Sequence, residues 1–412
     1  MPAPPPNVTG FACLACGREE PSGAGRFTCP SCGGNLDALY DYVAASAAMD
    51  RERIAASRDR SFARWAPLLP LAEESLPLTT PVGGTPLLRA ERLGRSLGLE
   101  NLFLKDDTAE PTASFKDRAS VVALLRARET GADTVAVAST GNAASSTAGI
   151  AAALGMRAVL FVPESAPEPK LVQMLLYGAR VVRVRGSYDD AFDLCGRAAE
   201  RFGWVDRSTG VNPFTAEGKK TAAFEIALDG GRRAPDWVLV PTGDGNILGA
   251  TGKGFREMRA LDWIDRLPRM VAVQAEGSSA IVRAFREGKK EAEEGPADTI
   301  ADSIRVGRPR DSVRALHALY DSDGLGVSVT DDRILAAAAR LARETGVFAE
   351  PSAAAGLAGL ERMVEENRVK PQDHVVLVIT GHGLKDPRTL SSGIEVPAAI
   401  DPTLEAVEEE IG

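Results

Sequence analysis

Short apolar runs alternate with alanine- and leucine-rich segments of helical length along most of the chain. The runs predict strands at Thr134–Val137, Ala158–Val162, Val181–Val184, Trp237–Val240, Val271–Val273 and Val375–Ile379. The segments between them predict helices, for example Ala143–Leu154 and Arg333–Glu344, and several of them stop at a glycine, which favours a left-handed helix end. Repeated strand–helix–strand units imply parallel strands, so an α/β fold with helices covering both faces of the sheets is predicted.

The chain outside this repeating pattern divides by composition. Residues 1–40 hold four of the five cysteines and are predicted to form a small separate module. Residues 41–76 are charged and helix-prone, and the turn-rich stretch Pro81–Leu87 opens the main body. The charged run Glu287–Asp298 predicts a surface loop, and residues 401–412 predict an acidic, solvated tail.

Composition and charge narrow the class of protein. The 412 residues are 44% hydrophobic and 25% charged, which is typical of a globular protein, and they are enough for two lobes. The net charge of −9 argues against nucleic acid as a partner. No apolar run reaches the roughly 20 residues that cross a bilayer, and the proline-rich start does not resemble a signal peptide. We therefore expect a cytoplasmic protein without a membrane partner.

Two closely spaced cysteine pairs mark the N-terminal module. Cys13 and Cys16 form the first C-x-x-C pair, Cys29 and Cys32 form the second, and twelve residues separate the pairs. In a reducing compartment this spacing favours a structural zinc site over two disulfides, because each turn can direct two thiolates at one tetrahedral ion. The alternative is a ribbon that no longer holds metal. Cys195 stands alone in a predicted helix and is interpreted as a small buried hydrophobic residue.

Lys116 is the first candidate for chemistry, because it stands where the loop after Glu110 becomes a helix. The positive end of a helix dipole disfavours an ammonium group and lowers its pKa. A surface lysine gains nothing there, whereas a neutral or covalently modified lysine does. The alternative is an ordinary helix start, with Asp117 and Arg118 pairing and capping the helix.

Three further loops each follow a predicted strand, where ligands bind in open α/β sheets. Ser139–Ala143 opens a helix and is either an anion site or a plain cap formed by Asn142. In Pro241–Ala250, the glycines at 243 and 245 let backbone amides converge on a phosphate of mononucleotide size or smaller. Thr380 ends the last strand, where its hydroxyl can meet a ligand ring. His382 is either a general base or a turn residue.

Together these loops resemble the threonine-synthase branch of the fold-type-II pyridoxal-phosphate enzymes. The resemblance runs from about Gly84 to Arg388 and includes the stretches Asn212–Thr221 and Ala349–Ala353. It implies a two-lobed α/β fold with parallel-rich sheets flanked by helices and a zinc-ribbon-like module. Residues 41–115 and 213–400 would form the large cofactor-binding lobe, and residues 116–212 a smaller, mobile lobe. A homodimer is implied as well.

The resemblance also implies roles for individual residues. Lys116 would hold pyridoxal 5′-phosphate as an imine and act as the base, Asn142 would donate to the phenolic oxygen, and Thr380 would meet the pyridine nitrogen. Phe115 would lie beside the ring. The cofactor phosphate would be held by the loop Gly243, Asp244, Gly245, Asn246 and Ile247. The candidates for binding the leaving phosphate are Ser139, Thr140 and Lys170.

The implied activity is that of a carbon–oxygen lyase acting on a small phosphorylated amino acid, O-phospho-L-homoserine. Glu110, Ala113, Thr215 and Asp244 depart from the pattern of the branch and put the substrate in question. The alternative enzyme is a β-replacement or β-elimination enzyme acting on O-phosphoserine, serine or threonine. A non-catalytic protein that binds nucleic acid through the ribbon is the alternative of another class, and the acidic charge disfavours it.

Overall fold

Two parallel-rich sheets form the framework of the protein. The computed structural model describes residues 4–139, 141–164, 166, 168–231, 233–392, 394 and 397–411. The larger sheet has the strand order β12–β11–β10–β13–β5–β4, and all its neighbours are parallel except β4 and β5. Its strands are β4 (Leu87–Arg89), β5 (Asn101–Asp106), β10 (Trp237–Pro241), β11 (Arg269–Ala275), β12 (Leu325–Val329) and β13 (His374–Ile379).

The smaller sheet is parallel throughout, with the order β8–β7–β6–β9. Its strands are β6 (Thr134–Ala138), β7 (Arg157–Pro163), β8 (Arg180–Val184) and β9 (Val205–Asp206). The two sheets fall in the segments that the sequence assigned to the large and the small lobe. The lobe boundaries themselves stay a prediction.

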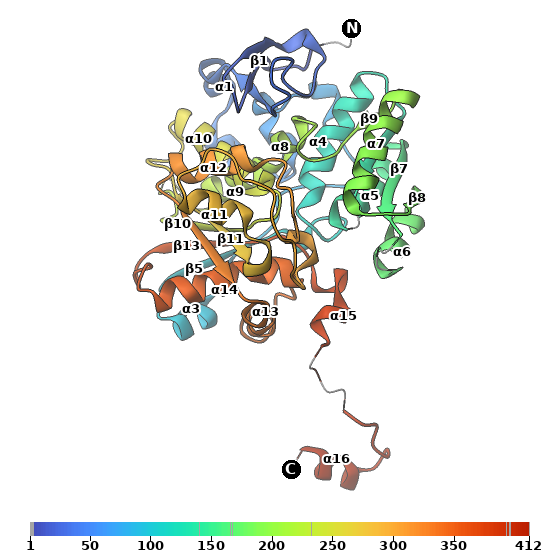
Figure 1. Ribbon diagram of the computed structural model, residues 1–412. Coiled ribbons are helices and arrows are strands. Elements are labelled where there is room, and N and C mark those ends of the chain that lie inside the picture. Colours follow the sequence, from blue (N-terminus) through green and yellow to red (C-terminus); the bar gives the residue numbers. More distant parts are fainter. Residues whose placement is uncertain are drawn as a thin grey trace.

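The N-terminal module is a three-stranded antiparallel sheet that packs on the body beside α4 and α8 (Figure 1). Its strands are β1 (Val8–Cys13), β2 (Glu19–Pro21) and β3 (Leu36–Tyr40). Phe11 and Phe27 of the module both place a ring edge against Phe214 of the body, with 6.0 Å between ring centroids. The module therefore shares its hydrophobic core with the main fold and is not a free appendage.

Helices cover the sheets and connect their strands. In the N-terminal half they are α1 (Tyr42–Ala48), α2 (Arg51–Ala56), α3 (Glu91–Leu97), α4 (Lys116–Glu129), α5 (Asn142–Leu154), α6 (Glu168–Leu176), α7 (Tyr188–Phe202), α8 (Phe214–Lys219) and α9 (Thr221–Asp229). In the C-terminal half they are α10 (Asn246–Ala260), α11 (Ala280–Arg286), α12 (Ser312–Asp321), α13 (Asp331–Thr345), α14 (Pro351–Glu365), α15 (Pro387–Leu390) and α16 (Leu404–Ile411).

The predicted α/β fold is confirmed, and all six predicted strands are present. Central strands such as β6, β10 and β13 are buried almost along their whole length, because helices lie on both sides of each sheet. In the two main sheets, the sequence did not reveal β4, β5, β9 or β12. β5 and β12 contain polar residues or glycine, so neither forms an uninterrupted apolar run, and β4 and β9 are only three and two residues long.

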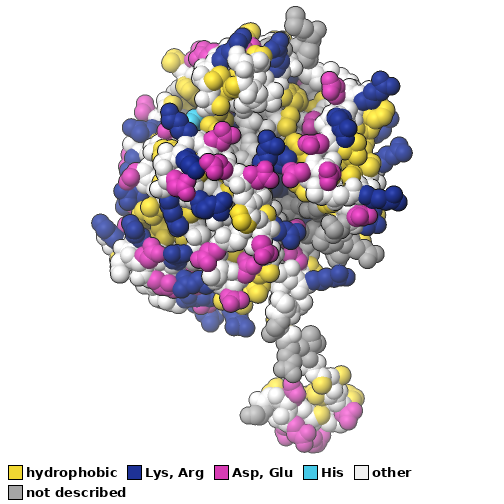
Figure 2. Space-filling view, viewed as in Figure 1, with side chains coloured by type: hydrophobic (Ala, Val, Ile, Leu, Met, Phe, Trp, Pro, Cys, Tyr) yellow, Lys and Arg dark blue, Asp and Glu magenta, His cyan; other side chains and the backbone are white. Residues whose placement is uncertain are grey.

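The surface agrees with the charge pattern of the sequence. On the face drawn in Figure 2, basic and acidic side chains are intermixed, and acidic side chains gather on the C-terminal segment. That segment, α16, extends away from the body and has no buried residue (Figure 1). Cys195 is fully buried in α7, as predicted. Among the described helices, none combines the length and hydrophobicity needed to cross a membrane.

Candidate active site

A cavity of about 490 Å³ lies at the carboxyl ends of β6, β10 and β13. Parallel α/β sheets bind ligands at the carboxyl ends of their strands, and the volume of the cavity is sufficient for small-molecule ligands. Eight residues singled out from the sequence line it together: Lys116, Ser139, Asn142, Gly243, Asp244, Gly245, Ile247 and Thr380. The predicted loops therefore converge on one site although they are far apart in the chain.

Lys116 opens α4, at the junction of loop and helix that the sequence indicated. Burial lowers the pKa of its ammonium group, and the nearby carboxylate of Asp244 only partly opposes this effect. The side chain forms no hydrogen bond or ion pair with any residue that the structure describes. Lys116 is thus a partly buried amine in a cavity, with a pKa shifted towards the neutral form.

The loop after β10 forms a cradle for an oxyanion. The backbone amides of Gly243, Asp244 and Gly245 line the cavity and form no hydrogen bond within the described part of the chain. They stand at the N-terminus of the 15-residue helix α10, where the helix dipole is positive. Gly245 has φ +96°, and a Cβ there would lie 2.8 Å from the backbone carbonyl oxygen of Asp311, so only glycine fits. Unpaired amides in this arrangement fit a phosphate group.

A half-buried aspartate and a fully buried lysine lie next to this cradle. Asp244 Oδ1 accepts a hydrogen bond from the Asn246 amide. Burial alone would raise the pKa of the Asp244 carboxyl, but the ammonium groups of Lys219 and Lys116 lower it below its usual value. Lys219 is fully buried and donates from Nζ to Asn246 Oδ1 at 2.5 Å. Burial, and then the neighbouring Lys116, lower the pKa of Lys219 well below its usual value, so the Asp244 carboxylate lies near a buried lysine that itself disfavours the charged form.

Asn142 is oriented by an acidic neighbour. Its Nδ2 donates to Glu350 Oε1 at 2.8 Å and to Ser303 Oγ at 3.3 Å. It is not the helix cap that the plain interpretation proposed, because α5 begins without a side-chain cap. Thr380 lines the cavity nearby, and its hydroxyl has no hydrogen-bond partner in the part of the chain that the structure describes. Thr380 can therefore meet a ligand directly, whereas Asn142 can donate to a ligand in place of its longer bond to Ser303.

The remaining predicted site residues lie elsewhere. Phe115 is fully buried behind the cavity, outside its lining, and its amide donates to the Thr380 carbonyl at 3.0 Å. Asn246 is buried beneath the cradle. Of the phosphate candidates, only Ser139 lines the cavity. Thr140 lies outside the described residues, as does the side chain of Lys170.

Two other sequence interpretations are settled by the contacts. Thr215 is fully buried, lies outside the lining, and donates from its hydroxyl to the Asn212 carbonyl. His382 also lies outside the lining, and its Nδ1 accepts the Leu384 amide at 3.1 Å. His382 is therefore a turn residue, and Thr215 offers the cavity no polar group.

The alternative interpretation of the start of α4, in which Asp117 and Arg118 pair and cap the helix, is wrong. Asp117 does not pair with Arg118 but accepts from the Thr112 amide and hydroxyl, each at 2.6 Å. Arg118 is fully buried and pairs with Asp107 at 2.6 Å, with Glu110 at 3.3 Å and with Glu225 at 2.7 Å. Both side chains thus fix the loop before Lys116, and neither caps the helix.

Ala113 carries strain in the same loop. Its φ is +63°, in the left-handed region, where a Cβ costs about 1 kcal/mol or more. We expect Ala113→Gly to raise the free energy of unfolding by roughly 0.5–1 kcal/mol, measured by urea denaturation. Ala198→Gly, within α7, is the control and is expected to lower it by about 1 kcal/mol. Equal loss of stability in both variants would contradict the strain at residue 113.

Four residues of the site were missed in the sequence. Glu350 and Ser303 line the cavity and position Asn142, and Arg207 lines it directly after β9. Lys219 supports the cradle from below. Arg207 follows β9, a two-residue strand that the sequence did not reveal. Glu350 and Lys219 lie in the stretches Ala349–Ala353 and Asn212–Thr221 that carried the resemblance, but their approach to the site depends on the tertiary fold, as does that of Ser303.

The four cysteines of the N-terminal module converge as predicted. Their sulfur atoms all lie within 4.8 Å of one another, with 3.5 Å between Cys13 and Cys32 and 3.8 Å between Cys16 and Cys29. Tetrahedral zinc with about 2.3 Å bonds to sulfur has sulfur–sulfur edges of about 3.8 Å. The cluster therefore has the geometry of a four-cysteine metal site.

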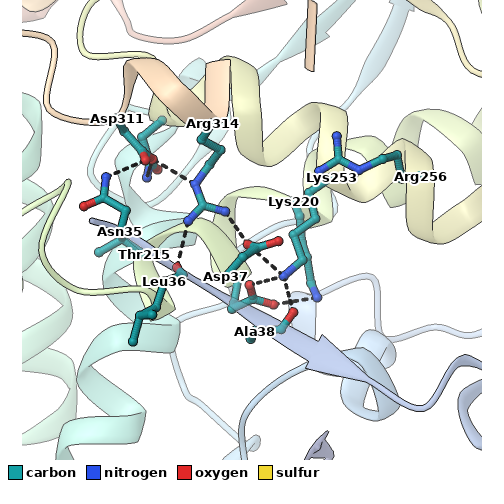
Figure 3. Close-up of polar contacts among 12 residues, drawn as sticks. Asn35, Leu36, Asp37, Ala38, Thr215, Lys220, Lys253, Arg256, Asp311 and Arg314 are labelled. Carbon is teal, nitrogen blue, oxygen red and sulfur yellow. Dashed lines mark hydrogen bonds and ion pairs between the residues drawn. The ribbon is translucent and has the colours of Figure 1, made fainter. Parts of the chain in front are cut away.

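Residues just after this cluster contact the residues that lie beneath the amide cradle (Figure 3). Asn35 Nδ2 donates to Asp311 Oδ1 at 2.7 Å. Asp311 Oδ2 in turn accepts from Asn246 Nδ2 at 2.5 Å. Arg314 bridges the two sides, because it pairs with Asp311 at 2.9 Å and also with Asp37 of β3. A continuous, partly buried polar network therefore connects the cysteine module with the loop that lines the cavity.

Comparisons with known proteins agree with this site. The family described as pyridoxal-phosphate dependent enzymes matches residues 78–381. The threonine synthase of Methanocaldococcus jannaschii is 39% identical over 395 residues, which cover 94% of this chain and 96% of that protein. The threonine synthase of Methanosarcina acetivorans is 38% identical and covers 97% of this chain and 98% of its own length. Both similarities thus extend over nearly the whole chain.

Solved structures share the fold at lower identity. A fungal L-serine ammonia-lyase from Rhizomucor miehei superposes with a TM-score of 0.64 at 22% identity, covering 75% of this chain and 96% of that one. The threonine deaminase isoform 2 of Solanum lycopersicum gives 0.61 at 23% identity, covering 72% of this chain and 79% of its own. These likenesses support the fold, which is that of fold-type-II enzymes.

Proposed function

The chain belongs to the pyridoxal-phosphate-dependent enzymes, in the group formed by threonine synthases, and on this premise we propose that it converts O-phospho-L-homoserine and water into L-threonine and phosphate. The observation that carries the proposal is the cavity itself. It brings the unpaired amine of Lys116, the amide cradle at 243–245 and the free hydroxyl of Thr380 together. These groups match the aldehyde, phosphate and ring nitrogen of the cofactor.

Pyridoxal phosphate, when bound, supplies an electron sink that makes the α and β hydrogens of an amino-acid substrate acidic. Lys116 would bind its aldehyde carbon, the cradle its phosphate, and Asn142 its phenolic oxygen. Thr380 offers the ring nitrogen a neutral hydroxyl, which does not keep that nitrogen protonated as a carboxylate would. Thr380 thereby favours elimination and replacement over transamination.

Proton transfer falls to Lys116. Its lowered pKa favours the neutral amine, which removes the proton from Cα of the substrate and then one from Cβ. After phosphate has left Cγ, Lys116 returns protons to Cγ and Cα, and water supplies the hydroxyl group at Cβ. Ser139 lies in the same cavity as a donor for the leaving phosphate.

A substrate panel tests the activity. The purified enzyme, supplied with pyridoxal phosphate, is given O-phosphohomoserine, O-phosphoserine, serine or threonine, and phosphate release and products are measured. Threonine from O-phosphohomoserine is expected. Phosphate release from O-phosphoserine alone, or deamination of serine or threonine alone, would replace the proposal with the alternative β-replacement or β-elimination activity.

We further propose that the four cysteines hold one structural zinc ion. The convergence of their sulfur atoms supports it, and about one zinc per chain is expected in protein purified without chelator. The cytoplasmic location, the homodimer and the roles of Thr140 and Lys170 stay predictions.

Removing the metal is expected to weaken cofactor binding. Asn35 contacts Asp311 and Asp37 contacts Arg314, and both contacts require the cysteine loops to keep their shape. Release of zinc by a mercurial reagent should raise the Kd of pyridoxal phosphate severalfold, measured by absorbance titration of the apoenzyme. Asn35→Ala should produce a change in the same direction with the metal in place. Unchanged cofactor affinity in both experiments would show that the cysteine module does not influence cofactor binding.

A further inference from the structure

A buried guanidinium group without a counter-ion lies in the wall of the cavity. Arg207 follows β9 directly, and its amide donates to the Ala136 carbonyl at 2.8 Å, which fixes it at the carboxyl end of the smaller sheet. Its side chain is fully buried from bulk solvent and yet lines the cavity that also holds Lys116. The function described above assigns this arginine no task.

The hydrogen bonds of Arg207 leave one nitrogen atom unused. Nε and Nη2 both donate to the Ser120 hydroxyl, at 3.3 and 3.1 Å, and Nη2 reaches the Lys116 carbonyl at 3.5 Å. Nη1 is buried and has no partner among the described residues. No carboxylate of the described chain lies within ion-pair distance of this guanidinium. A buried cation that is left unpaired in this way is strongly destabilising.

Other buried arginines of this chain are paired. Arg118 contacts three carboxylates, and Arg314 contacts Asp311 and Asp37. Burial lowers the pKa of Arg207 to about 10, so it stays a cation at neutral pH. Its missing counter-ion is therefore expected to be an anion that enters the cavity.

We propose that Arg207 binds a phosphate group in the cavity through Nη1, and that this phosphate is the one that the substrate loses. The choice of phosphate rests on the proposed function. The cofactor phosphate already has the amide cradle and, beneath it, Lys219. Arg207 lies instead against the backbone of Lys116, the residue that acts at the reacting carbon atoms. Arg207 would thus select substrates that carry a phosphate.

The test separates the two phosphates without relying on turnover. Inorganic phosphate, the product, is titrated into the enzyme loaded with pyridoxal phosphate, and the Kd is measured by calorimetry for the wild type, Arg207→Met and Arg207→Lys. Pyridoxal phosphate is titrated into the three apoenzymes in parallel. Arg157→Met is the matched control, because it removes an exposed arginine of the same charge.

Arg207→Met is expected to raise the Kd of inorganic phosphate at least about tenfold, because a charged hydrogen bond is lost. The Kd of pyridoxal phosphate should change less than about twofold. Arg207→Lys should recover part of the loss. A loss in cofactor affinity alone would overturn the assignment to the substrate and place Arg207 at the cofactor phosphate. If both affinities match the Arg157→Met control, Arg207 binds no phosphate.

Variants that fold poorly do not leave the question open. Arg207→Lys keeps the charge and the burial, so its phosphate affinity can be read even where Arg207→Met is unstable. These titrations use inorganic phosphate, so their outcome does not depend on O-phosphohomoserine being the substrate. Failure of the substrate panel with a preserved phosphate effect would reject the proposed activity and keep the phosphate site.

Discussion

Replacing Lys116 with alanine is expected to lower threonine formation about 10⁴-fold or more, because in the proposed function one side chain serves both as the covalent anchor of the cofactor and as the base. The variant should also lose the visible absorbance of the bound cofactor. Its fold should remain, since the Lys116 side chain makes no hydrogen bond or ion pair with the described residues.

Three measurements check this expectation. Phosphate release reports turnover, absorbance reports the covalent attachment, and borohydride reduction followed by peptide mapping identifies the modified lysine. Lys290→Ala is the control, because this lysine is exposed in a surface loop and should leave all three readings unchanged. Trapping of the cofactor at another lysine, with activity retained in Lys116→Ala, would remove the basis of the proposed function.

Replacing Arg118 with methionine is expected to produce the largest loss of stability, about 3–5 kcal/mol in the free energy of unfolding. The side chain is fully buried among the carboxylates of Asp107, Glu110 and Glu225. Lys105 also pairs with Glu225 at 2.6 Å. The cluster thus holds two cations and three carboxyl groups.

The pKa values indicate how this cluster is balanced. Burial, together with the neighbouring Asp107, raises the pKa of Glu110 well above its usual value, which favours the protonated form. Burial also acts to raise the pKa of Glu225, but Arg118 and Lys105 lower it well below its usual range. Loss of Arg118 leaves two ionised carboxylates with one cation, and this charge has no access to water.

Chemical denaturation with urea measures the effect. Arg157→Met is the control, because its ion pair with Asp133 is more than two-thirds exposed on both sides and should contribute less than about 1 kcal/mol. If Arg118→Met is too unstable to purify, Glu225→Gln removes one charge of the same cluster and is expected to be destabilising too. Stability losses no larger than in Arg157→Met for both variants would contradict the importance of the cluster.

The loops that carry chemistry were the part of the site most accessible from sequence. Lys116, Asn142, the glycines at 243 and 245, and Thr380 each stand at the end of a strand or the start of a helix. Residue type and local position are enough to find such residues, because parallel strands bring their carboxyl ends to one edge. The spacing of the cysteines was equally informative, since four sulfur atoms at C-x-x-C spacing have few other arrangements.

Contacts between distant segments could not be read in this way. Glu350 reaches Asn142 across more than two hundred residues, and Asn35 reaches Asp311 across 276. Such pairs depend on how whole elements pack, and polar residues in the interior leave no periodic signal. The weak strands β5 and β12 were missed for a related reason, because their pairing with buried neighbours, rather than their own composition, makes them strands.

Sequence alone determined the α/β class, the place of Lys116 at a helix start, the glycine-containing loop after β10 and the cysteine cluster, since each follows from local residue order. Only the tertiary structure decided how charge is distributed in the interior. It paired Arg118 and Arg314 with carboxylates, set Lys219 against Asn246, and left Arg207 without a counter-ion at the cavity. The physical reason is that the energy of a buried charge depends on its neighbours in space, and folding alone brings those neighbours together.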